Sequence, residues 1–213
     1  MRLTVVVGGA VVVAFAFSGC GGSHNTTSTT STTSTTSATL PAGTPAALRG
    51  AHGSLLGTGE LAGFVPRGTP TLGTSAESWV ADEQVPPEKR AAETAKLRAL
   101  GFVAGLEQRL ASTHGGTGEA ISIVELFHSS HGASAEAAST LKQATGRGET
   151  TFAAPGVPGG HGFGSSAGNA NVTFSIGPYY YLVGDQVPSG TPATTARAQL
   201  VAAAESLYRR ATR

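Results

Sequence analysis

The side chains best suited to hold a metal ion are two histidines, His128 and His131, in the stretch His-Ser-Ser-His. They fall where a predicted strand ends and a predicted helix begins, and two imidazoles at such a junction can share a metal ion with Glu125 or Glu136 as third ligand. The same histidines also fit surface or capping positions at a helix start, with Ser130 as an alternative cap. Neither glutamate stands at a spacing diagnostic of a metal site. The sequence therefore predicts no cofactor, and a metal-dependent hydrolase ranks third among the functional hypotheses.

Aromatic side chains offer a second kind of candidate site. Tyr179, Tyr181, Phe163 and Trp79 could line a surface that binds a carbohydrate or an apolar ligand. In an alternating strand Tyr179 and Tyr181 share one face and Tyr180 faces the other, so at least one tyrosine face belongs to the core. For these residues, ligand binding and core packing both stay open.

Signals of catalysis are weak. The acidic residues of the domain include several glutamates, but their spacing pairs no two of them for acid–base work. The glycine-rich stretch from Gly156 to Gly164 lacks the Lys-Ser/Thr ending of a phosphate-binding loop and fits a loop or a bulged strand. We therefore expect the domain not to be an enzyme.

The single cysteine, Cys20, follows an apolar run from Leu3 to Phe17 that is preceded by Arg2. Such a run is short for a membrane span and typical of the core of a signal peptide. One thiol cannot form an intramolecular disulfide or a multi-thiolate metal site. The sequence Phe17-Ser18-Gly19-Cys20 resembles the lipobox of bacterial lipoproteins, with Phe17 in place of the usual Leu. The resemblance implies lipidation of Cys20, cleavage before it, and an extracytoplasmic protein anchored in the cell membrane.

A low-complexity segment separates the lipobox from the rest of the chain. Residues 26–37 repeat Thr-Thr-Ser four times and contain no apolar side chain to bury, so burial cannot offset their ordering entropy. We expect a signal peptide over residues 1–19, a lipidated cysteine with a disordered Thr/Ser/Pro-rich tether over 20–50, and one globular domain over 51–213.

Composition indicates a folded domain with no preference for nucleic acid. Hydrophobic residues make up 39% of the chain and charged residues 13%, and the formal net charge is +1. A domain of this size can bury a real core, and without a basic excess nucleic acid is not an expected partner. The expected partners are the membrane, through the lipid anchor, and an envelope protein or a small apolar ligand.

Periodicity predicts strands and helices in an order typical of an α+β protein. We expect short apolar strands, an Ala-rich helix, and a hairpin whose two-residue turn pairs Ile176 with Tyr179. Residues 152–163 carry no clear pattern. The predicted strands are Leu55–Val65, Phe102–Leu110, Ala120–Phe127, Asn171–Ile176 and Tyr179–Val183, and the predicted helices begin near Ser75 and cover Glu88–Leu100, Gly132–Ala144 and Thr195–Ala211. Hairpins separated by helices favour an antiparallel sheet with amphipathic helices packed on it.

The stretch from Leu97 to Gly105, followed by Ser122 to Phe127 and an Ala-rich helix, is similar to uncharacterised actinobacterial cell-envelope lipoproteins. Its layout is similar to small antiparallel domains of the ferredoxin-like and PsbP-like folds. No activity comes with this resemblance. We expect a non-catalytic binding or interaction module, or alternatively an envelope carrier that holds a small apolar or lipid ligand between the sheet and its helices.

Overall fold

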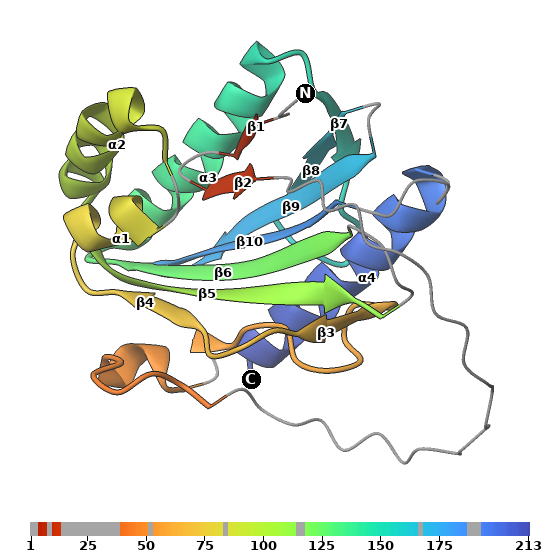
Figure 1. Ribbon diagram of the computed structural model, residues 1–213, viewed down its shortest axis with the longest axis horizontal. Coiled ribbons are helices and arrows are strands. Elements are labelled where there is room, and N and C mark those ends of the chain that lie inside the picture. Colours follow the sequence, from red (N-terminus) through yellow and green to blue (C-terminus); the bar gives the residue numbers. More distant parts are fainter. Residues whose placement is uncertain are drawn as a thin grey trace, which may run out of the picture.

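The computed structural model describes residues 4–7, 10–13, 39–50, 53–82, 85–113, 118–165, 168–186 and 193–213. These residues form the expected α+β fold, with an eight-stranded antiparallel sheet in the order β3-β5-β6-β10-β9-β8-β7 and β4 beside β5 (Figure 1). The strands of this sheet are β3 (Phe64–Pro66), β4 (Thr71–Gly73), β5 (Phe102–Ser112), β6 (Glu119–Phe127), β7 (Thr150–Ala153), β8 (His161–Gly164), β9 (Asn169–Ile176) and β10 (Tyr179–Gln186). The helices are α1 (Ala76–Asp82), α2 (Pro87–Leu100), α3 (Ser130–Gly146) and α4 (Ala193–Ala211), with a short 3-10 turn at Ala46–Leu48.

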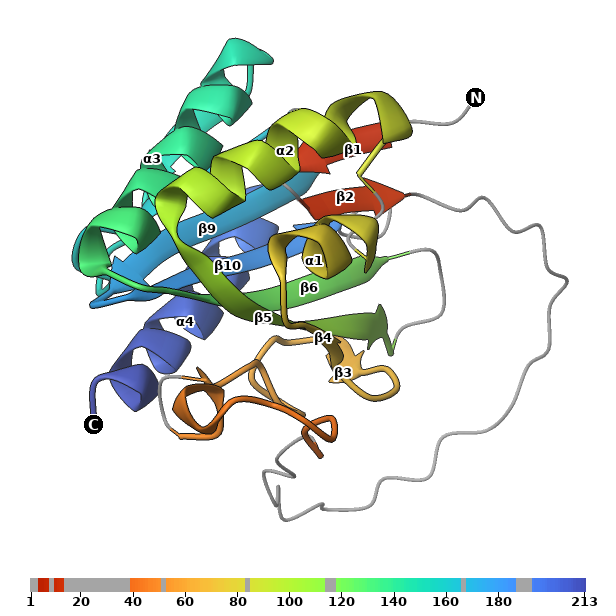
Figure 2. The ribbon, with the colours of Figure 1, turned by 90° about the vertical axis from the view of Figure 1, so that its left-hand side faces the viewer.

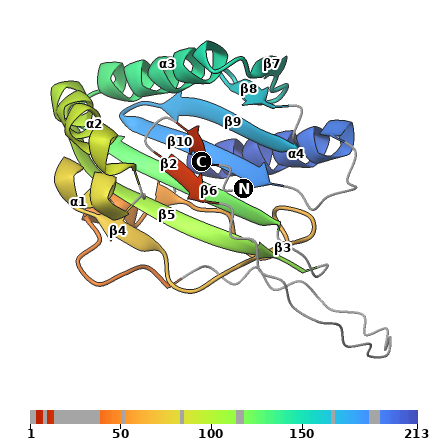
Figure 3. The ribbon, with the colours of Figure 1, turned by 45° about the horizontal axis from the view of Figure 1, so that its top comes forward.

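The sheet separates two layers of helices. Helices α1, α2 and α3 cover one face, and α4 lies across the other face (Figures 1 and 3). The order of elements is not the βαββαβ order of a ferredoxin-like domain, because β7, β8, β9 and β10 follow one another as hairpins. The fold is therefore a three-layer arrangement built around an antiparallel sheet.

The hairpin of β9 and β10 has the predicted register. Ile176 pairs with Tyr179, and Phe174 pairs with Tyr181. Gly177 has a φ of 53°, a left-handed conformation that glycine adopts readily in a tight turn. Because this register places Phe174 and Tyr181 on the same face, both side chains reach the layer under α4.

The layer between the sheet and α4 is filled by apolar side chains. The rings of Phe174 and Tyr181 stack with centroids 4.8 Å apart, and Tyr208 of α4 meets Phe174 edge-on at 5.8 Å. Leu200 and Leu207 of α4 have no exposed surface. Each large apolar side chain buried in this way contributes roughly 1.5–3 kcal/mol. Packing of this layer is therefore a main source of stability.

Two sequence expectations about the core are wrong. Residues 39–50 were assigned to the tether, but Leu48 is fully buried and Leu40 packs against the core. The domain therefore begins before residue 51, because these leucines supply apolar surface within a Pro/Ala-rich stretch. The alternation from Val172 to Ile176 predicts that Thr173 faces outward, but Thr173 is fully buried because α3 covers that face, and its hydroxyl donates to the Tyr181 carbonyl at 3.2 Å.

Other element boundaries differ by small amounts. The first predicted strand shrinks to β3, and the unassigned residues 152–163 contain the end of β7, a turn and the start of β8. Ser75 caps α1 as expected, accepting a bond from the Ser78 backbone at 3.2 Å. The cap of α3 is Ser129, which accepts from the Gly132 N–H at 3.2 Å, and not the proposed Ser130.

Part of the apolar run from Leu3 to Phe17 forms a separate hairpin. Strands β1 (Thr4–Val7) and β2 (Ala10–Val13) pair antiparallel, and they lie between α2 and α3 on the α1–α3 side of the sheet (Figures 1 and 2). No helix within the described ranges is long and apolar enough to cross a membrane. Cys20 and the Thr-Thr-Ser repeat lie outside the described residues.

Candidate functional site

A hollow of about 610 Å³ lies between β7 and α4 at one edge of the sheet. We call it the β7–α4 groove. Its volume falls within the range of small-molecule sites, roughly 300–1,000 Å³. Its walls are mainly apolar, with Arg197, Glu205 and Thr194 as the polar side chains, and the apolar wall residues include Phe152, Pro155, Ala198, Val201 and Ala202.

The helical wall of the groove follows from the spacing of its residues. Positions 194, 197, 198, 201, 202 and 205 fall on one side of a helix, beside the stripe that α4 buries against the sheet. On the opposite wall, β7 contributes Phe152, and the turn after it contributes Pro155 and Gly156. The groove thus runs along α4 and beside the last strand of the sheet.

Arg197 marks one end of the groove with a positive charge. Its guanidinium lies 5.1 Å from the centre of the Phe152 ring and donates to the Thr150 hydroxyl at 3.4 Å. No carboxylate in the described part of the chain forms an ion pair with it. An aromatic ring orients a guanidinium without neutralising it, so this cation is free to bind an anion.

Glu205 marks the other end with a negative charge. Its side chain crosses Gly156, where an added Cβ would lie 2.5 Å from the Glu205 Cδ. Gly156 also has a φ of 82°, so both its conformation and the close approach favour glycine. Glu205 is 3.9 Å from Arg209 and partly exposed, and an exposed pair at this distance is worth little. The groove is therefore positive at Arg197 and negative at Glu205.

Strand β7 leaves one row of backbone groups open. The Ser165 N–H donates to the Asn169 carbonyl at 3.1 Å, so these two residues form a hydrogen-bonded pair beside β8 and β9. Because bonded residues alternate along an antiparallel strand, Gly162 and Gly164 of β8 direct their peptide groups toward β7. By that alternation Thr150 and Phe152 turn their peptide groups toward β8, whereas Thr151 and Ala153 turn theirs away from the sheet. No described residue bonds to these outward groups.

A second polar feature is a buried cluster under α1, α2 and α3. The Trp79 indole N–H donates to Glu125 of β6 at 2.7 Å. The Lys96 ammonium of α2 lies 2.8 Å from Glu136 of α3 and 2.6 Å from Glu93. Glu125 and Glu136 are almost completely buried, and each keeps a buried Oε2 with no hydrogen-bond partner among the described residues.

Charge in this cluster is unbalanced, because Glu93, Glu125 and Glu136 face a single lysine. Burial, reinforced by the charge of Glu136, raises the pKa of Glu125 to about 8. Burial also raises the pKa of Glu136, although Lys96 opposes the shift. Burial lowers the pKa of Lys96, but the two carboxylates beside it more than offset this and raise it overall. Glu125 is therefore protonated at neutral pH.

The cluster fastens three helices to the sheet. Thr140 of α3 lies 3.2 Å from the Tyr180 hydroxyl of β10, and burial raises the Tyr180 pKa well above 10.0. A raised carboxyl pKa can mark an active site. Here Trp79, Glu125 and Tyr180 are enclosed, so a substrate has no direct access to them, and we interpret the cluster as structural.

The two histidines weighed as weak metal-ligand candidates do not converge with the glutamates. His128 and His131 are both exposed, whereas Glu125 and Glu136 are directed into the buried cluster. Across the described ranges no group of three potential ligands could hold a metal ion. The strand turns Glu125 inward while the histidines follow it onto the surface, so sequence proximity does not become spatial convergence.

The four aromatic residues that the sequence suggested as ligand-binding are also far apart in the fold. Trp79 and Phe163 are buried on the α1–α3 side of the sheet, and Tyr181 is buried under α4. Tyr179 is partly buried and donates to the Ala47 carbonyl at 3.3 Å. They therefore form no common surface. The groove uses a different aromatic residue, Phe152, which lay in the unassigned stretch.

Two stretches match catalytic motifs by spacing and were not among the predicted candidates. The run from Gly164 to Gly168 has the Gly-x-Ser-x-Gly spacing, but it joins the antiparallel strands β8 and β9, whereas a nucleophile elbow joins a strand to a helix. Ser139 and Lys142 have the Ser-x-x-Lys spacing on α3, but the Ser139 hydroxyl accepts from the Gln143 amide at 3.3 Å and forms no hydrogen bond with Lys142 among the described residues. Neither match supports catalysis.

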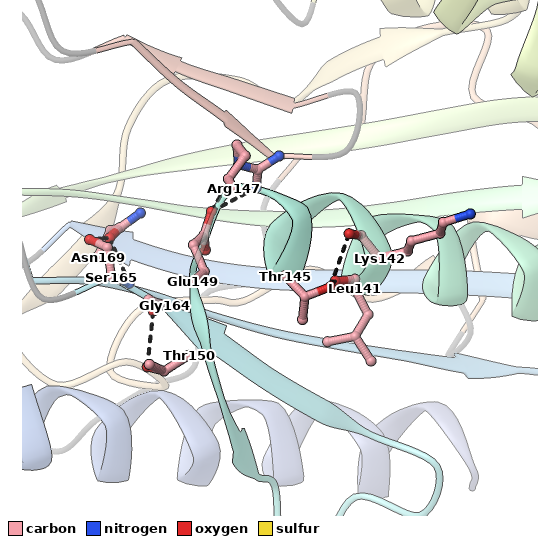
Figure 4. Close-up of polar contacts among 9 residues, drawn as sticks. All are labelled: Leu141, Lys142, Thr145, Arg147, Glu149, Thr150, Gly164, Ser165 and Asn169. Atoms are coloured by element: carbon pink, nitrogen blue, oxygen red, sulfur yellow. Dashed lines mark hydrogen bonds and ion pairs between the residues drawn. The ribbon is translucent and has the colours of Figure 1, made fainter.

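Polar contacts around the start of β7 hold the strand in place. Arg147 and Glu149 pair at 2.7 Å, and the Thr150 hydroxyl donates to the Gly164 carbonyl at 3.2 Å (Figure 4). These contacts fix one wall of the groove. No protein-family model, curated protein or solved structure matches this chain.

Proposed function

We propose that this chain is a lipid-anchored, extracytoplasmic binding module that holds its partner in the β7–α4 groove. The observation that carries this proposal is the groove itself, which combines apolar walls with a cation, Arg197, that pairs with no carboxylate of the described residues. A groove of this composition favours a ligand with both apolar and charged groups.

The filled layer under α4 also supports this function. The stack of Phe174 and Tyr181 and the buried leucines of α4 occupy the layer where a carrier would hold its ligand. The groove opens instead at the rim of this layer, where a partner can dock without displacing the core. Lipidation of Cys20 would keep the domain at the membrane and leave this rim accessible.

Photo-crosslinking in the producing cell tests this function. We place a photoreactive phenylalanine analogue at Ala198 in the groove and, as a matched control, at Ala99 on the exposed side of α2. We expect an adduct of defined mass from Ala198, none of that mass from Ala99, and loss of the adduct when Val201→Arg is added. An Ala198 variant that yields no adduct, or one that Val201→Arg leaves unchanged, contradicts the proposal.

A second function, the carrier of an apolar or lipid ligand, is favoured by the position of the hairpin that β1 and β2 form. Strands β1 and β2, built largely of valine, lie between α2 and α3 on the sheet (Figure 2). Cleavage before Cys20 would remove this hairpin and uncover the strip of sheet beneath it, which an apolar ligand could then cover.

Native mass spectrometry tests the carrier. The processed chain extracted from its own membrane should retain a non-covalent lipid. Cys20→Ser should block processing, keep the hairpin in place and carry no such lipid. A processed chain without bound lipid contradicts this second function and leaves the groove hypothesis intact.

A further inference from the structure

We propose that the partner in the β7–α4 groove is an extended peptide that adds to β7 as an antiparallel strand, with a carboxylate at its carboxyl end paired to Arg197. This inference rests on the proposed function and specifies the class of ligand. Three features support it: the open backbone row of β7, the lack of protection on that strand, and the opposite charges at the two ends of the groove.

The backbone row supplies the hydrogen bonds. Thr151 and Ala153 direct their N–H and C=O groups away from β8. A peptide laid beside β7 can satisfy these groups as another strand of the sheet would, which is how β-strand addition gains affinity. The neighbouring strands are all antiparallel, so an antiparallel peptide continues the existing pattern.

The two edges of the sheet differ in their protection. At one edge, β3 ends in Pro66, which lacks an N–H, and Arg67 follows it. Proline and charge are devices that keep edge strands from pairing with other chains. At the other edge, β7 reads Thr-Thr-Phe-Ala, with no proline or charge within the strand itself, and three of its four residues are exposed. An unprotected edge next to an apolar groove is a template for a partner strand.

The charges select the orientation of the peptide. Arg197 contacts Thr150 at the start of β7, and Glu205 lies beside Gly156, which follows the strand. An antiparallel peptide therefore places its carboxyl end near the cation and its amino end near the anion. The eight helical steps from Arg197 to Glu205 span about 12 Å, which matches about four extended residues.

Side-chain alternation then separates two roles. The peptide residue opposite Phe152 and those two positions away from it point into the groove toward Val201. Their N–H groups face away from β7. Residues opposite Thr151 and Ala153 point away from α4, and their N–H groups bond to β7. The first set should be apolar, whereas the second set can be any residue that tolerates a strand.

A panel of fluorescein-labelled hexapeptides tests the proposal with the full chain in detergent micelles. The peptides read Lys-X-Thr-X-Thr-X, with Val, Leu or Phe at X and a free carboxyl end. Binding is followed by fluorescence anisotropy. We expect at least one member to bind, and its carboxyl-end amide to bind about threefold to tenfold more weakly. In the Arg197→Gln variant this difference should disappear.

Backbone methylation distinguishes strand addition from simple groove filling. N-methylation of both Thr residues should weaken binding at least tenfold, whereas N-methylation at two X residues should change it less than threefold. In the protein, Thr151→Pro removes one outward donor and should weaken binding about tenfold. Thr151→Val keeps the donor and should bind as the parent does. Since proline is tolerated at an outward edge position, the melting temperature should confirm that Thr151→Pro is folded.

Failure of this inference can be told apart from failure of the proposed function. Equal losses from both methylation patterns, or no peptide that binds better than its amide, overturn strand addition. If the Ala198 crosslink still forms in the cell, the groove binds a partner of another chemistry and the proposed function stands. A dimer of this chain joined through β7 that excludes the peptide also overturns the inference.

Discussion

Replacement of Glu125 by glutamine should change how the stability of the fold depends on pH. Glutamine keeps an oxygen that can accept from the Trp79 indole, which lies 2.7 Å from Glu125 in the parent, but it cannot ionise. It therefore imitates the protonated side chain. At pH 5 we expect the free energy of unfolding of Glu125→Gln to lie within about 1 kcal/mol of the parent.

The magnitude at higher pH follows from proton linkage. Burial raises the pKa of Glu125 from 4.5 to about 8, so between these values the folded state holds a proton that the unfolded state releases. The free energy of unfolding then falls as pH rises, with the stabilisation complete below 4.5 and lost by about 8. From pH 5 to pH 8 the loss is about 3 kcal/mol. Glu125→Gln lacks this loss and should gain about that amount over the parent.

Urea unfolding at several pH values measures the difference. The matched control is Glu88→Gln at the exposed start of α2, which makes the same chemical change outside the buried cluster. Comparing each variant with the parent cancels the contribution of Asp185, which burial also shifts upward, to a pKa of about 7. A Glu125→Gln difference that stays constant from pH 5 to pH 8 would refute the raised pKa of Glu125.

Three further substitutions test the fold around the groove and the core. Phe174→Ala should lower the free energy of unfolding by about 3–5 kcal/mol in urea titrations, because it leaves a cavity in the ring stack under α4; a loss below about 1 kcal/mol would contradict that packing. Ser129→Ala should cost about 1 kcal/mol and Ser130→Ala much less, since only Ser129 caps α3; equal melting temperatures for the two would be inconsistent with this cap. Gly156→Ala should destabilise more than Gly159→Ala, because both have a positive φ but only the first meets an α4 side chain; equal losses would show that the contact is unimportant.

The sequence predicted those elements whose structure follows from one regular spacing of apolar residues, either strand alternation or helical periodicity. The alternation from Val172 to Ile176 and the Gly-Pro turn gave the register of the β9–β10 hairpin, because a two-residue turn fixes which residues pair. The apolar stripe of α4 and the left-handed Gly101 after α2 were equally readable. In each case the information lies within about twenty residues.

Features that depend on distant residues were not readable. The cluster joins Trp79, Lys96, Glu125 and Glu136 from four elements, and no spacing along the chain predicts that they meet. Strand β7 has only four residues without apolar alternation and precedes a glycine-rich stretch, so pairing with β8 determines the strand. The burial of Leu48 was not predicted, because a single leucine in a linker-like sequence shows no apolar periodicity.

Carbene footprinting in the membranes of the producing cell tests most directly whether a partner occupies the groove. The reagent labels accessible apolar side chains, and Val65, the exposed large apolar residue on β3, serves as an internal reference. We expect Val201 and Ala202 to be labelled several-fold less in the native membrane than in the purified protein, with labelling of Val65 unchanged. Equal labelling of Val201 in both settings, with Val65 as reference, would mean that the groove is empty where the protein works and would contradict the binding function.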